Sequence, residues 1–326
     1  MPDKPEAARQ PETLYLVIPC YNEEAVLPET SRRLIEKLQQ METDGMVSDK
    51  SRILFVDDGS KDKTWNLISQ LHEQHKQVSG LKLSRNRGHQ NALLAGLMTA
   101  KQYADMVISL DADLQDDVDA IDRFVTEYYK GSDVVYGVRS SRATDTAFKR
   151  GTAQGFYKFM QALGVDIVDN HADYRLMSRR ALDALSQYRE VNLFLRGVVP
   201  LIGFPSAIVT YERHERFAGE SKYPLKKMLS FAFDGITSFS VKPIRMITWL
   251  GVLIFFASMM MLLILLVQKL FGYTVQGWTT LMGSIWMIGG IQLLCLGMIG
   301  EYVGKIYAEV KQRPRFIIDQ LLNEVE

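Results

Sequence analysis

Two long apolar runs near the carboxyl end constrain the fold of this chain more than any other feature. Neither Met246–Val267 nor Trp278–Gly300 contains a charged residue. Each is long enough for a helix of about 20 residues, which crosses the hydrocarbon core of a bilayer. Two helices of a soluble core would be unusual at this length without a charge. Because a short connector, 271–277, separates the runs, the sequence predicts a membrane hairpin.

Basic residues flank this predicted hairpin on its outer sides. Lys242 and Arg245 precede the first run and Lys305 and Lys311 follow the second, whereas the connector itself has no basic residue. The positive-inside rule therefore places both termini in the cytoplasm, with the protein in the cell (inner) membrane. Residues 1–13 are charged and lack an apolar run, so we expect a disordered N-terminus and no signal peptide.

The composition of the remaining chain indicates a soluble domain. The 326 residues carry 38 basic and 38 acidic side chains, and this neutrality argues against a nucleic-acid partner. Cys20 lies at the end of a predicted strand and Cys295 inside the second apolar run, so a disulfide between them is implausible. This fits a domain in the reducing cytoplasm.

Strand-like and helical segments alternate through the first 140 residues. The strand-like segments are 14–19, 52–56, 80–83, 106–110 and 133–138, and the helical ones are 24–40, 63–75, 89–101 and 118–129. This alternation predicts an α/β fold with a doubly wound, mainly parallel sheet. Ligands of such sheets bind outside the carboxyl ends of the strands.

Polar side chains gather at those strand ends. They are Asn22, Glu23, Asp57, Asp58, Asp111, Asp113 and Arg139. Asp111 and Asp113 offer oxygen ligands to a hard divalent cation, which in turn binds phosphate. The pattern alone is a weak signal, since such pairs also occur in solvated turns. The glycine fingerprints of dinucleotide-binding and phosphate-binding loops are absent.

The segment 223–240 precedes the first apolar run and mixes apolar residues with Lys226 and Lys227. This pattern predicts an amphipathic helix in the headgroup region of the membrane. An ordinary core helix is the alternative.

Four motifs in this order resemble the family 2 glycosyltransferases that act on polyprenyl phosphate, including the bactoprenol (undecaprenyl-phosphate) glycosyltransferases and, further away, dolichol-phosphate mannose synthase. The motifs are Pro19-Cys-Tyr-Asn-Glu-Glu24, Asp57-Asp-Gly-Ser60, Asp111-Ala-Asp-Leu-Gln115 and Glu215-Arg-Phe-Ala-Gly-Glu-Ser-Lys-Tyr223. The resemblance implies a GT-A fold over a cytoplasmic catalytic domain, 14–222, and inverting transfer from a nucleotide sugar. An interfacial helix (223–243), two transmembrane helices (244–270 and 278–303) and a cytoplasmic tail (304–326) would follow.

The resemblance also implies roles for individual residues on the donor side. The nucleotide sugar would contact Pro19, Tyr21, Glu23, Asp57, Asp58, Asp111 and Arg139. Mg²⁺ or Mn²⁺ would be bound by Asp111, Asp113 and Gln115, with Asp113 counted among the catalytic residues. For Asp57 and Asp58, turn formation and helix capping are the alternative roles.

On the acceptor side, Asp173 is the candidate catalytic carboxylate, with a cap or a salt bridge as its alternative role. A phosphate monoester has a second pKa near 6, so it is already ionised at neutral pH. Asp173 would then position the acceptor more than remove a proton. The acceptor or diphosphate phosphates would contact Lys149, Arg150, Arg213, Arg216, Ser221 and Lys222. Of two histidines nearby, we expect His171 to be structural and His89 to lie near the donor site.

The expected reaction is transfer of glucose or N-acetylglucosamine from a UDP-sugar to undecaprenyl phosphate, for glycosylation of the cell envelope. Membrane lipids are a further partner, and the family implies a homotetramer, to which the spacing of Gly300 and Gly304 would contribute. One alternative is a processive polysaccharide synthase, although the Arg-Trp pair usual there is missing. The other is a non-catalytic membrane scaffold.

Overall fold

The structure is a computed structural model that describes residues 10–139, 171–190, 195–212 and 277–323, with isolated positions between 247 and 271. The described residues fall into two units, a globular unit that contains the sheet and a second unit that contains helix α10. The elements are β1 (Leu14–Cys20), α1 (Leu27–Thr43), β2 (Arg52–Asp57), α2 (Thr64–Gln74), β3 (Val78–Leu83), α3 (His89–Ala100), β4 (Met106–Ser109), α4 (Ala120–Tyr129), β5 (Val134–Arg139), β6 (His171–Ser178), α6 (Arg179–Leu185), α7 (Leu195–Leu201), β7 (Ser206–Tyr211), α10 (Trp278–Val310) and β8 (Ile318–Leu322).

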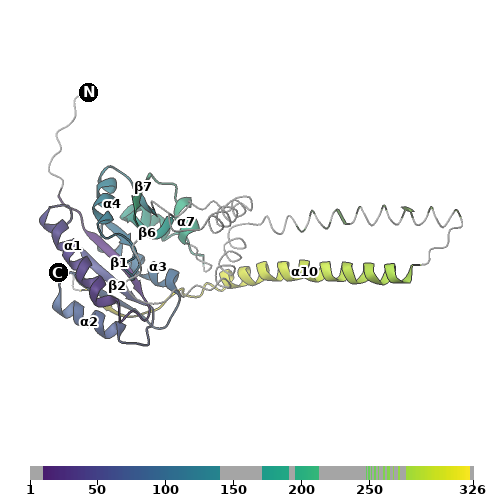
Figure 1. The fold of residues 1–326 in the computed structure, drawn as a ribbon, viewed down its shortest axis with the longest axis horizontal. Helices are drawn as coiled ribbons and strands as arrows, with labels where there is room; N and C mark the ends of the chain where they lie inside the picture. The colour runs from purple at the N-terminus through teal and green to yellow at the C-terminus, as the bar shows by residue number, and fades with distance from the viewer. Residues whose placement is uncertain are drawn as a thin grey trace, which may run out of the picture. The chain divides into compact units, whose positions relative to one another are not determined.

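The globular unit is built on one eight-stranded sheet with the order β7-β5-β6-β4-β1-β2-β3-β8 (Figure 1). Strands β1 to β4 pair in parallel, and so do β5 and β7, whereas β6 and β8 run antiparallel to their neighbours. The predicted α/β architecture is therefore confirmed, and each strand and helix predicted before residue 140 is present. The sheet is mixed, because it also contains two antiparallel strands that the sequence pattern did not indicate.

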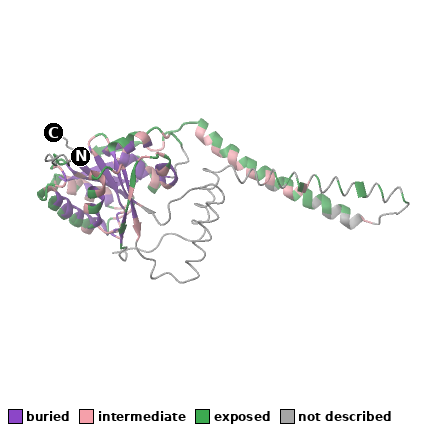
Figure 2. Cartoon of the chain, turned by 90° about the horizontal axis from the view of Figure 1, so that it is seen from above, coloured by how far each residue is buried: buried purple, intermediate pink, exposed green. Residues whose placement is uncertain are grey.

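Burial explains why the strands of this sheet could be recognised. All seven residues of β1 are buried, as expected for a central strand covered on both faces. Figure 2 shows buried residues concentrated in the strands of the globular unit. Helix α3 packs closely on the sheet through Gly96, where a Cβ atom would lie 2.4 Å from the Val17 side chain and 2.7 Å from that of Val56.

The antiparallel strand β6 lies between β4 and β5 and thereby sets the position of the site. In its pairing with β4, Arg175 lies opposite Ser109 and Leu176 opposite Ile108. The beginning of β6 therefore meets the carboxyl end of β4. Residues distant in sequence, Asp111 and Asp173, are brought to the same edge of the sheet by this register.

Strand β8 comes from the segment predicted to be a cytoplasmic tail. It pairs with β3 and forms the last strand on that side of the sheet. The Ser84 backbone N–H donates to the Ile317 carbonyl (3.0 Å), and Asn323 Oδ1 accepts from the Ser79 hydroxyl (2.8 Å). At the other end of the chain, the backbone N–H groups of Glu12 and Thr13, the last residues of the segment expected to be disordered, donate to Tyr129 and Asp105.

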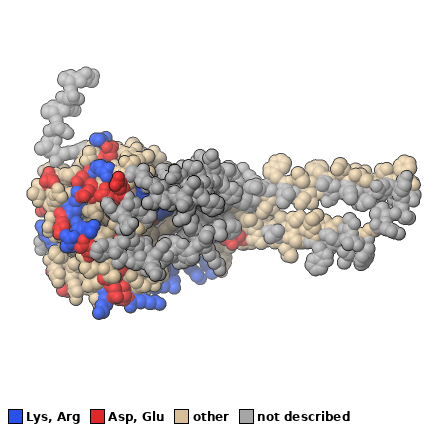
Figure 3. All heavy atoms as spheres, viewed as in Figure 1, with Lys and Arg blue, Asp and Glu red and all other residues tan. Residues whose placement is uncertain are grey.

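Helix α10 forms the described part of the second unit and extends beyond the predicted span 278–303. One helix in the described part of the chain, over Met287–Val310, has the length and the mean hydropathy (1.4) of a membrane-crossing segment. None of that helix is buried within the chain, and Figure 3 shows few charged side chains along it. The predicted interfacial helix 223–243 and most of the first span, 244–270, lie outside the described residues.

Candidate functional site

The carboxyl ends of three adjacent parallel strands, β2, β1 and β4, meet at one edge of the sheet and carry most of the predicted donor-site residues. Pro19 is buried near the end of β1, in register with Val56. Tyr21 follows it and is 36% exposed. The Glu23 backbone N–H donates to the Thr64 hydroxyl at 2.9 Å and so ties this loop to the start of α2.

The first aspartate turn, residues 57–60, follows β2 and uses its two carboxylates differently. The two oxygens of Asp58 accept hydrogen bonds from the backbone N–H groups of Arg87 (2.7 Å) and Gly88 (2.8 Å). Asp57 is fully buried; one oxygen accepts a backbone N–H within the turn at 3.2 Å, and Oδ2 has no hydrogen-bond partner among the described residues. Burial raises the pKa of Asp57 above its ordinary value. Both carboxylate oxygens of Asp58 are therefore used in hydrogen bonds within the protein. Asp57, in contrast, keeps one oxygen that can accept a hydrogen bond from a ligand.

Gly59 allows the first aspartate turn to lie against the chain that leads into α3. Its φ is +67°, and a Cβ atom there would lie 2.6 Å from the Asn86 backbone nitrogen and 2.7 Å from the Arg85 carbonyl carbon. A side chain at this position would meet both a strained dihedral and a steric clash. The loop held in this way ends at His89, the first residue of α3.

The second aspartate turn, residues 111–117, follows β4 and is hydrogen-bonded to a side chain of helix α1. The Thr30 hydroxyl on α1 donates to the Ala112 carbonyl at 2.7 Å. Leu114 adopts φ +57°, a left-handed conformation that is uncommon for leucine. The Gln115 backbone N–H donates to Asp113 Oδ1 at 3.2 Å. The Asp111 side chain stays 42% exposed, so this turn presents a carboxylate to solvent.

Like charges crowd the second aspartate turn. Partial burial and the carboxylates of Asp116, Asp173 and Asp113 raise the pKa of Asp111 to about 6, although His89 acts to lower it. The His89 Nε2 atom lies 3.8 Å from Asp111 Oδ1 and 3.3 Å from Asp173 Oδ2. A cation bound at this turn would offset the repulsion between Asp111 and its neighbouring carboxylates.

The residues present fit a divalent cation that is shared with a substrate. Within the described ranges, no group of three or more His, Cys, Asp or Glu side chains could hold a metal ion. Mg²⁺ usually binds through one or two carboxylates together with water and substrate phosphates, which is the arrangement that Asp111 and Asp113 offer. All of these ligands are oxygens, which suits Mg²⁺ or Mn²⁺.

Asp173 lies at the start of β6 inside a network of cations. Its carboxylate is 12% exposed and accepts from Arg175 at 2.8 Å and from Arg196 on α7 at 3.1 Å, with His89 as a third partner. Its backbone carbonyl accepts the Ser109 hydroxyl of β4. Burial alone would raise the pKa of Asp173, but His89, Arg196 and Arg175 hold it well below the ordinary value.

This network changes what Asp173 can do. A carboxylate with a strongly lowered pKa is a weak proton acceptor at neutral pH, so its geometry favours positioning over general-base catalysis. Arg175 is almost fully buried, whereas the Arg196 side chain is 44% exposed and can face a ligand.

Sequence reasoning placed His89 near the donor site but did not identify Arg175 and Arg196. Their sequence positions carry no spacing signal, because the three residues meet only when β6 and α7 come together beside α3. Arg175 follows Asp173 by two residues, and this i, i+2 spacing on a strand was the one available hint.

The remaining predicted site residues divide into one that is described and a larger set that is not. Arg139, at the end of β5, donates from Nε to the Tyr211 hydroxyl at 3.4 Å. The predicted phosphate-binding residues Lys149, Arg150, Arg213, Arg216, Ser221 and Lys222 lie outside the described residues.

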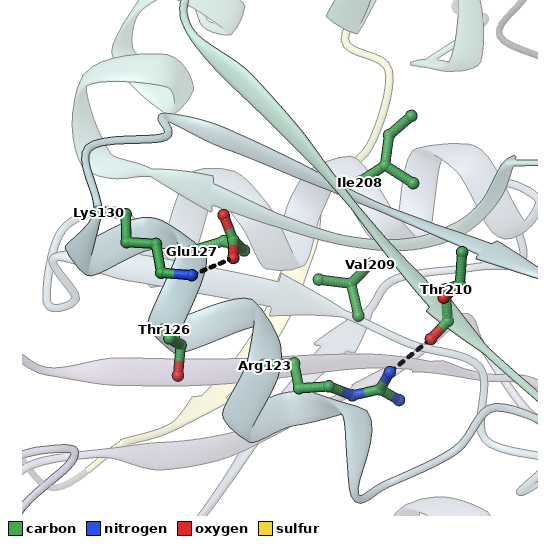
Figure 4. Close-up of a pocket in the computed structure, with 7 residues that line it drawn as sticks. All are labelled: Arg123, Thr126, Glu127, Lys130, Ile208, Val209 and Thr210. Atoms are coloured by element: carbon green, nitrogen blue, oxygen red, sulfur yellow. Dashed lines mark hydrogen bonds and ion pairs between the residues drawn. The ribbon is translucent and has the colours of Figure 1, made fainter.

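A shallow depression between α4 and β7 contains none of the predicted site residues (Figure 4). It is lined by Arg123, Thr126, Glu127, Lys130, Ile208, Val209 and Thr210. Figure 4 shows its cations already engaged, with Lys130 on Glu127 (2.7 Å) and Arg123 on the Thr210 carbonyl (2.6 Å). It is therefore a weaker candidate site than the sheet edge.

Comparison with known proteins places this geometry in a family. Glycosyl transferase family 2 matches residues 15–186, and the GtrB C-terminal hairpin matches residues 242–306. The glycosyltransferase YkoT of Bacillus subtilis (strain 168) is 56% identical over 312 residues, which cover 95% of this chain and 93% of the relative. The SfII prophage-derived bactoprenol glucosyl transferase of Shigella flexneri is 38% identical over 93% of this chain and 96% of its own length.

Among solved structures, glucosyl-3-phosphoglycerate synthase from Mycobacterium tuberculosis, in complex with Mn²⁺, UDP-glucose and phosphoglyceric acid, matches with a TM-score of 0.43 and 18% identity. The match covers 69% of this chain and 78% of that one. The sequence relatives match over almost their whole length, and the family 2 match covers the strands and turns that build the site. The chain therefore belongs to glycosyl transferase family 2, is a glycosyltransferase, and carries the GtrB C-terminal hairpin.

Proposed function

We propose that the protein transfers a sugar from a UDP-sugar to undecaprenyl phosphate (bactoprenol phosphate) at the cytoplasmic face of the cell membrane. The observation that carries this proposal is the pair of partly exposed carboxylates, Asp111 and Asp113, beside the cationic network of Asp173. A bactoprenol glucosyl transferase 38% identical over most of the chain supports the acceptor class and favours glucose, with N-acetylglucosamine as the second choice.

The donor would lie across the two aspartate turns. Asp57 Oδ2, which has no hydrogen-bond partner among the described residues, would accept a nucleoside N–H or hydroxyl, and the partly exposed Tyr21 directly after β1 would contact the base. The diphosphate would reach Asp111 and Asp113, which would hold Mg²⁺ or Mn²⁺. A bound cation stabilises the negative charge that develops on the leaving diphosphate.

The acceptor would enter beside Asp173. Since its phosphate is ionised near neutral pH, it can attack the anomeric carbon without first losing a proton. Asp173 holds Arg196 and His89 in place, and the half-exposed Arg196 guanidinium attracts the acceptor phosphate. Attack from the face opposite the leaving diphosphate inverts the anomeric configuration.

A membrane hairpin at the carboxyl end of the chain would bring such an enzyme close to its lipid acceptor. A polyprenyl chain stays in the bilayer, so a membrane anchor brings the site to the headgroup plane. The GtrB C-terminal hairpin match over residues 242–306 and the apolar surface of α10 support this anchoring.

The test uses the purified full chain with undecaprenyl phosphate and a panel of labelled nucleotide sugars, with Mn²⁺ or with excess EDTA. We expect one donor to give a lipid-linked monosaccharide only when the metal is present. Failure of every donor, or full activity in EDTA, would overturn the proposed reaction. A ladder of longer products would instead identify a processive synthase.

A further inference from the structure

Asp116 is a buried carboxylate for which the proposed reaction gives no role. It is 4% exposed, and Tyr211 at the end of β7 donates its hydroxyl hydrogen to Asp116 Oδ1 at 2.6 Å. Its other oxygen, Oδ2, is buried and has no hydrogen-bond partner among the described residues. Burying an ionised carboxylate with one oxygen unpaired costs free energy, so its presence beside the second aspartate turn calls for an explanation.

The surroundings of Asp116 connect it to both carboxylates of the proposed cation site. Asp116 belongs to the second aspartate turn and follows Gln115 directly. Its side chain is buried, whereas Asp111 and Asp113 on the same turn are partly exposed. The carboxylate of Asp116 therefore adds its charge from the buried side of the turn.

A rigid aromatic support holds Asp116 there. The Tyr174 ring contacts the Tyr211 ring edge-on with centroids 5.1 Å apart, and it packs against Phe124 at 4.6 Å. The Tyr174 hydroxyl donates to the Asp117 carbonyl at 2.8 Å. Gly137 makes room for this arrangement, because a Cβ atom there would lie 3.1 Å from the Tyr211 ring. Both tyrosines therefore bind the same short stretch of chain.

We propose that Asp116, held by Tyr211, is a positioning residue that fixes the second aspartate turn and strengthens its binding of a divalent cation. Asp116 adds negative charge behind Asp111 and Asp113, and Tyr211 keeps that charge in place. Partners that orient metal ligands in this way typically contribute about 10- to 100-fold to metal affinity. This inference rests on the proposed function in so far as the second aspartate turn binds a metal.

The experiment measures Mn²⁺ binding to the full chain with UDP present, by the electron paramagnetic resonance signal of free Mn²⁺. Tyr211→Phe removes the hydroxyl but keeps the ring, and Asp116→Asn removes the charge but keeps the shape. We expect each to weaken Mn²⁺ binding about 10-fold or more. The double variant should lose less than the product of the two effects, because the two groups act together.

Tyr128→Phe is the matched control. It also removes a hydroxyl that donates to a carboxylate, that of Glu12, but on α4 away from the turn. Its Mn²⁺ affinity should equal that of the unaltered chain. As a second readout, raising Mn²⁺ should restore the turnover of Tyr211→Phe, which a general loss of folding would not allow.

The outcomes separate this inference from the proposed function. Unchanged Mn²⁺ affinity in Tyr211→Phe and Asp116→Asn would overturn the positioning role while leaving the reaction intact. Loss of binding in Asp116→Asn with none in Tyr211→Phe would make Asp116 a direct ligand, and this too contradicts the proposal. If the unaltered chain binds no Mn²⁺, the metal-dependent reaction itself fails.

Discussion

The two aspartate turns each begin with a closely spaced pair of aspartates and follow strands on either side of β1, yet they use their carboxylates in opposite ways. In the first, Asp58 accepts with both oxygens from the backbone N–H groups of Arg87 and Gly88 and is almost fully buried. In the second, Asp111 stays partly exposed, and partial burial together with the neighbouring carboxylates raises its pKa. A carboxylate whose oxygens both accept hydrogen bonds from the protein stabilises the fold. A partly exposed carboxylate surrounded by other carboxylates is repelled by them, and a bound cation relieves this repulsion.

The largest expected effect is a loss of activity on substitution in the second aspartate turn. Asp111→Asn should lower the rate of sugar transfer by about 10²–10³-fold, because charge stabilisation of the leaving diphosphate is lost. Its thermal unfolding temperature should stay the same or rise, since one of several repelling charges is removed. Transfer of labelled sugar and thermal unfolding measure the two effects.

Asp44→Asn is the control for that substitution. Asp44 lies at the exposed end of α1, outside both aspartate turns, and the substitution should be neutral in both measurements. Strong destabilisation by Asp111→Asn would show that its carboxylate, like that of Asp58, serves the fold.

A substitution of Asp58 in the first aspartate turn should lower the free energy of unfolding. Asp58→Ala leaves two buried N–H groups without acceptors and should cost about 3–5 kcal/mol, because hydrogen bonds to a charged group are each worth about 1.5–3 kcal/mol. Thermal unfolding of the full chain in detergent, followed by tryptophan fluorescence, measures this loss. Asp44→Ala at the exposed end of α1 provides the control. If Asp58→Ala weakens only UDP binding, Asp58 belongs to the nucleotide site, as the sequence resemblance implied.

Substitutions at two glycines, one in the first aspartate turn and one outside it, distinguish the cost of backbone strain from that of a steric clash. Gly59 and Gly45 share φ +67°, but a Cβ atom at Gly59 would lie 2.6 Å from a backbone nitrogen, whereas one at Gly45 would meet open space. Gly45→Ala should cost about 1 kcal/mol for the left-handed conformation alone, and Gly59→Ala about 2–3 kcal/mol. Equal unfolding temperatures for the two variants would contradict a tight contact between Gly59 and the loop before α3.

The smallest effect is expected at Asp57, the residue of the first aspartate turn with one oxygen that accepts no hydrogen bond from the described residues. Asp57→Asn should weaken UDP binding by about 10-fold, the worth of one hydrogen bond to a charged group, with little change in stability. Calorimetric titration with UDP measures the affinity. A fall in unfolding temperature as large as that of Asp58→Ala, with unchanged UDP affinity, would assign both aspartates of this turn to the fold.

Local patterns allowed much of this architecture to be predicted. β1 and β2 are apolar runs that end in polar residues, so their positions and the location of Asp57 at a strand end could be read directly. Most of helix α10 could be found in the same way, because the length of the run Trp278–Gly300 and its lack of charge are local properties. β6 and β8 were missed because each joins the sheet through pairing with a distant strand, and no local pattern specifies that partner.

The sequence by itself determined the strand ends, the aspartate pairs and the apolar carboxyl-terminal runs, because periodicity and residue chemistry act over a few neighbours. Only the tertiary structure decided which carboxylates are free for a ligand. Asp58 meets Arg87 and Gly88, and Asp173 meets Arg196, across distances in sequence that only the strand order closes. The use of each aspartate depends on its neighbours in space, since hydrogen-bond donors and charges act on a carboxylate only at short range.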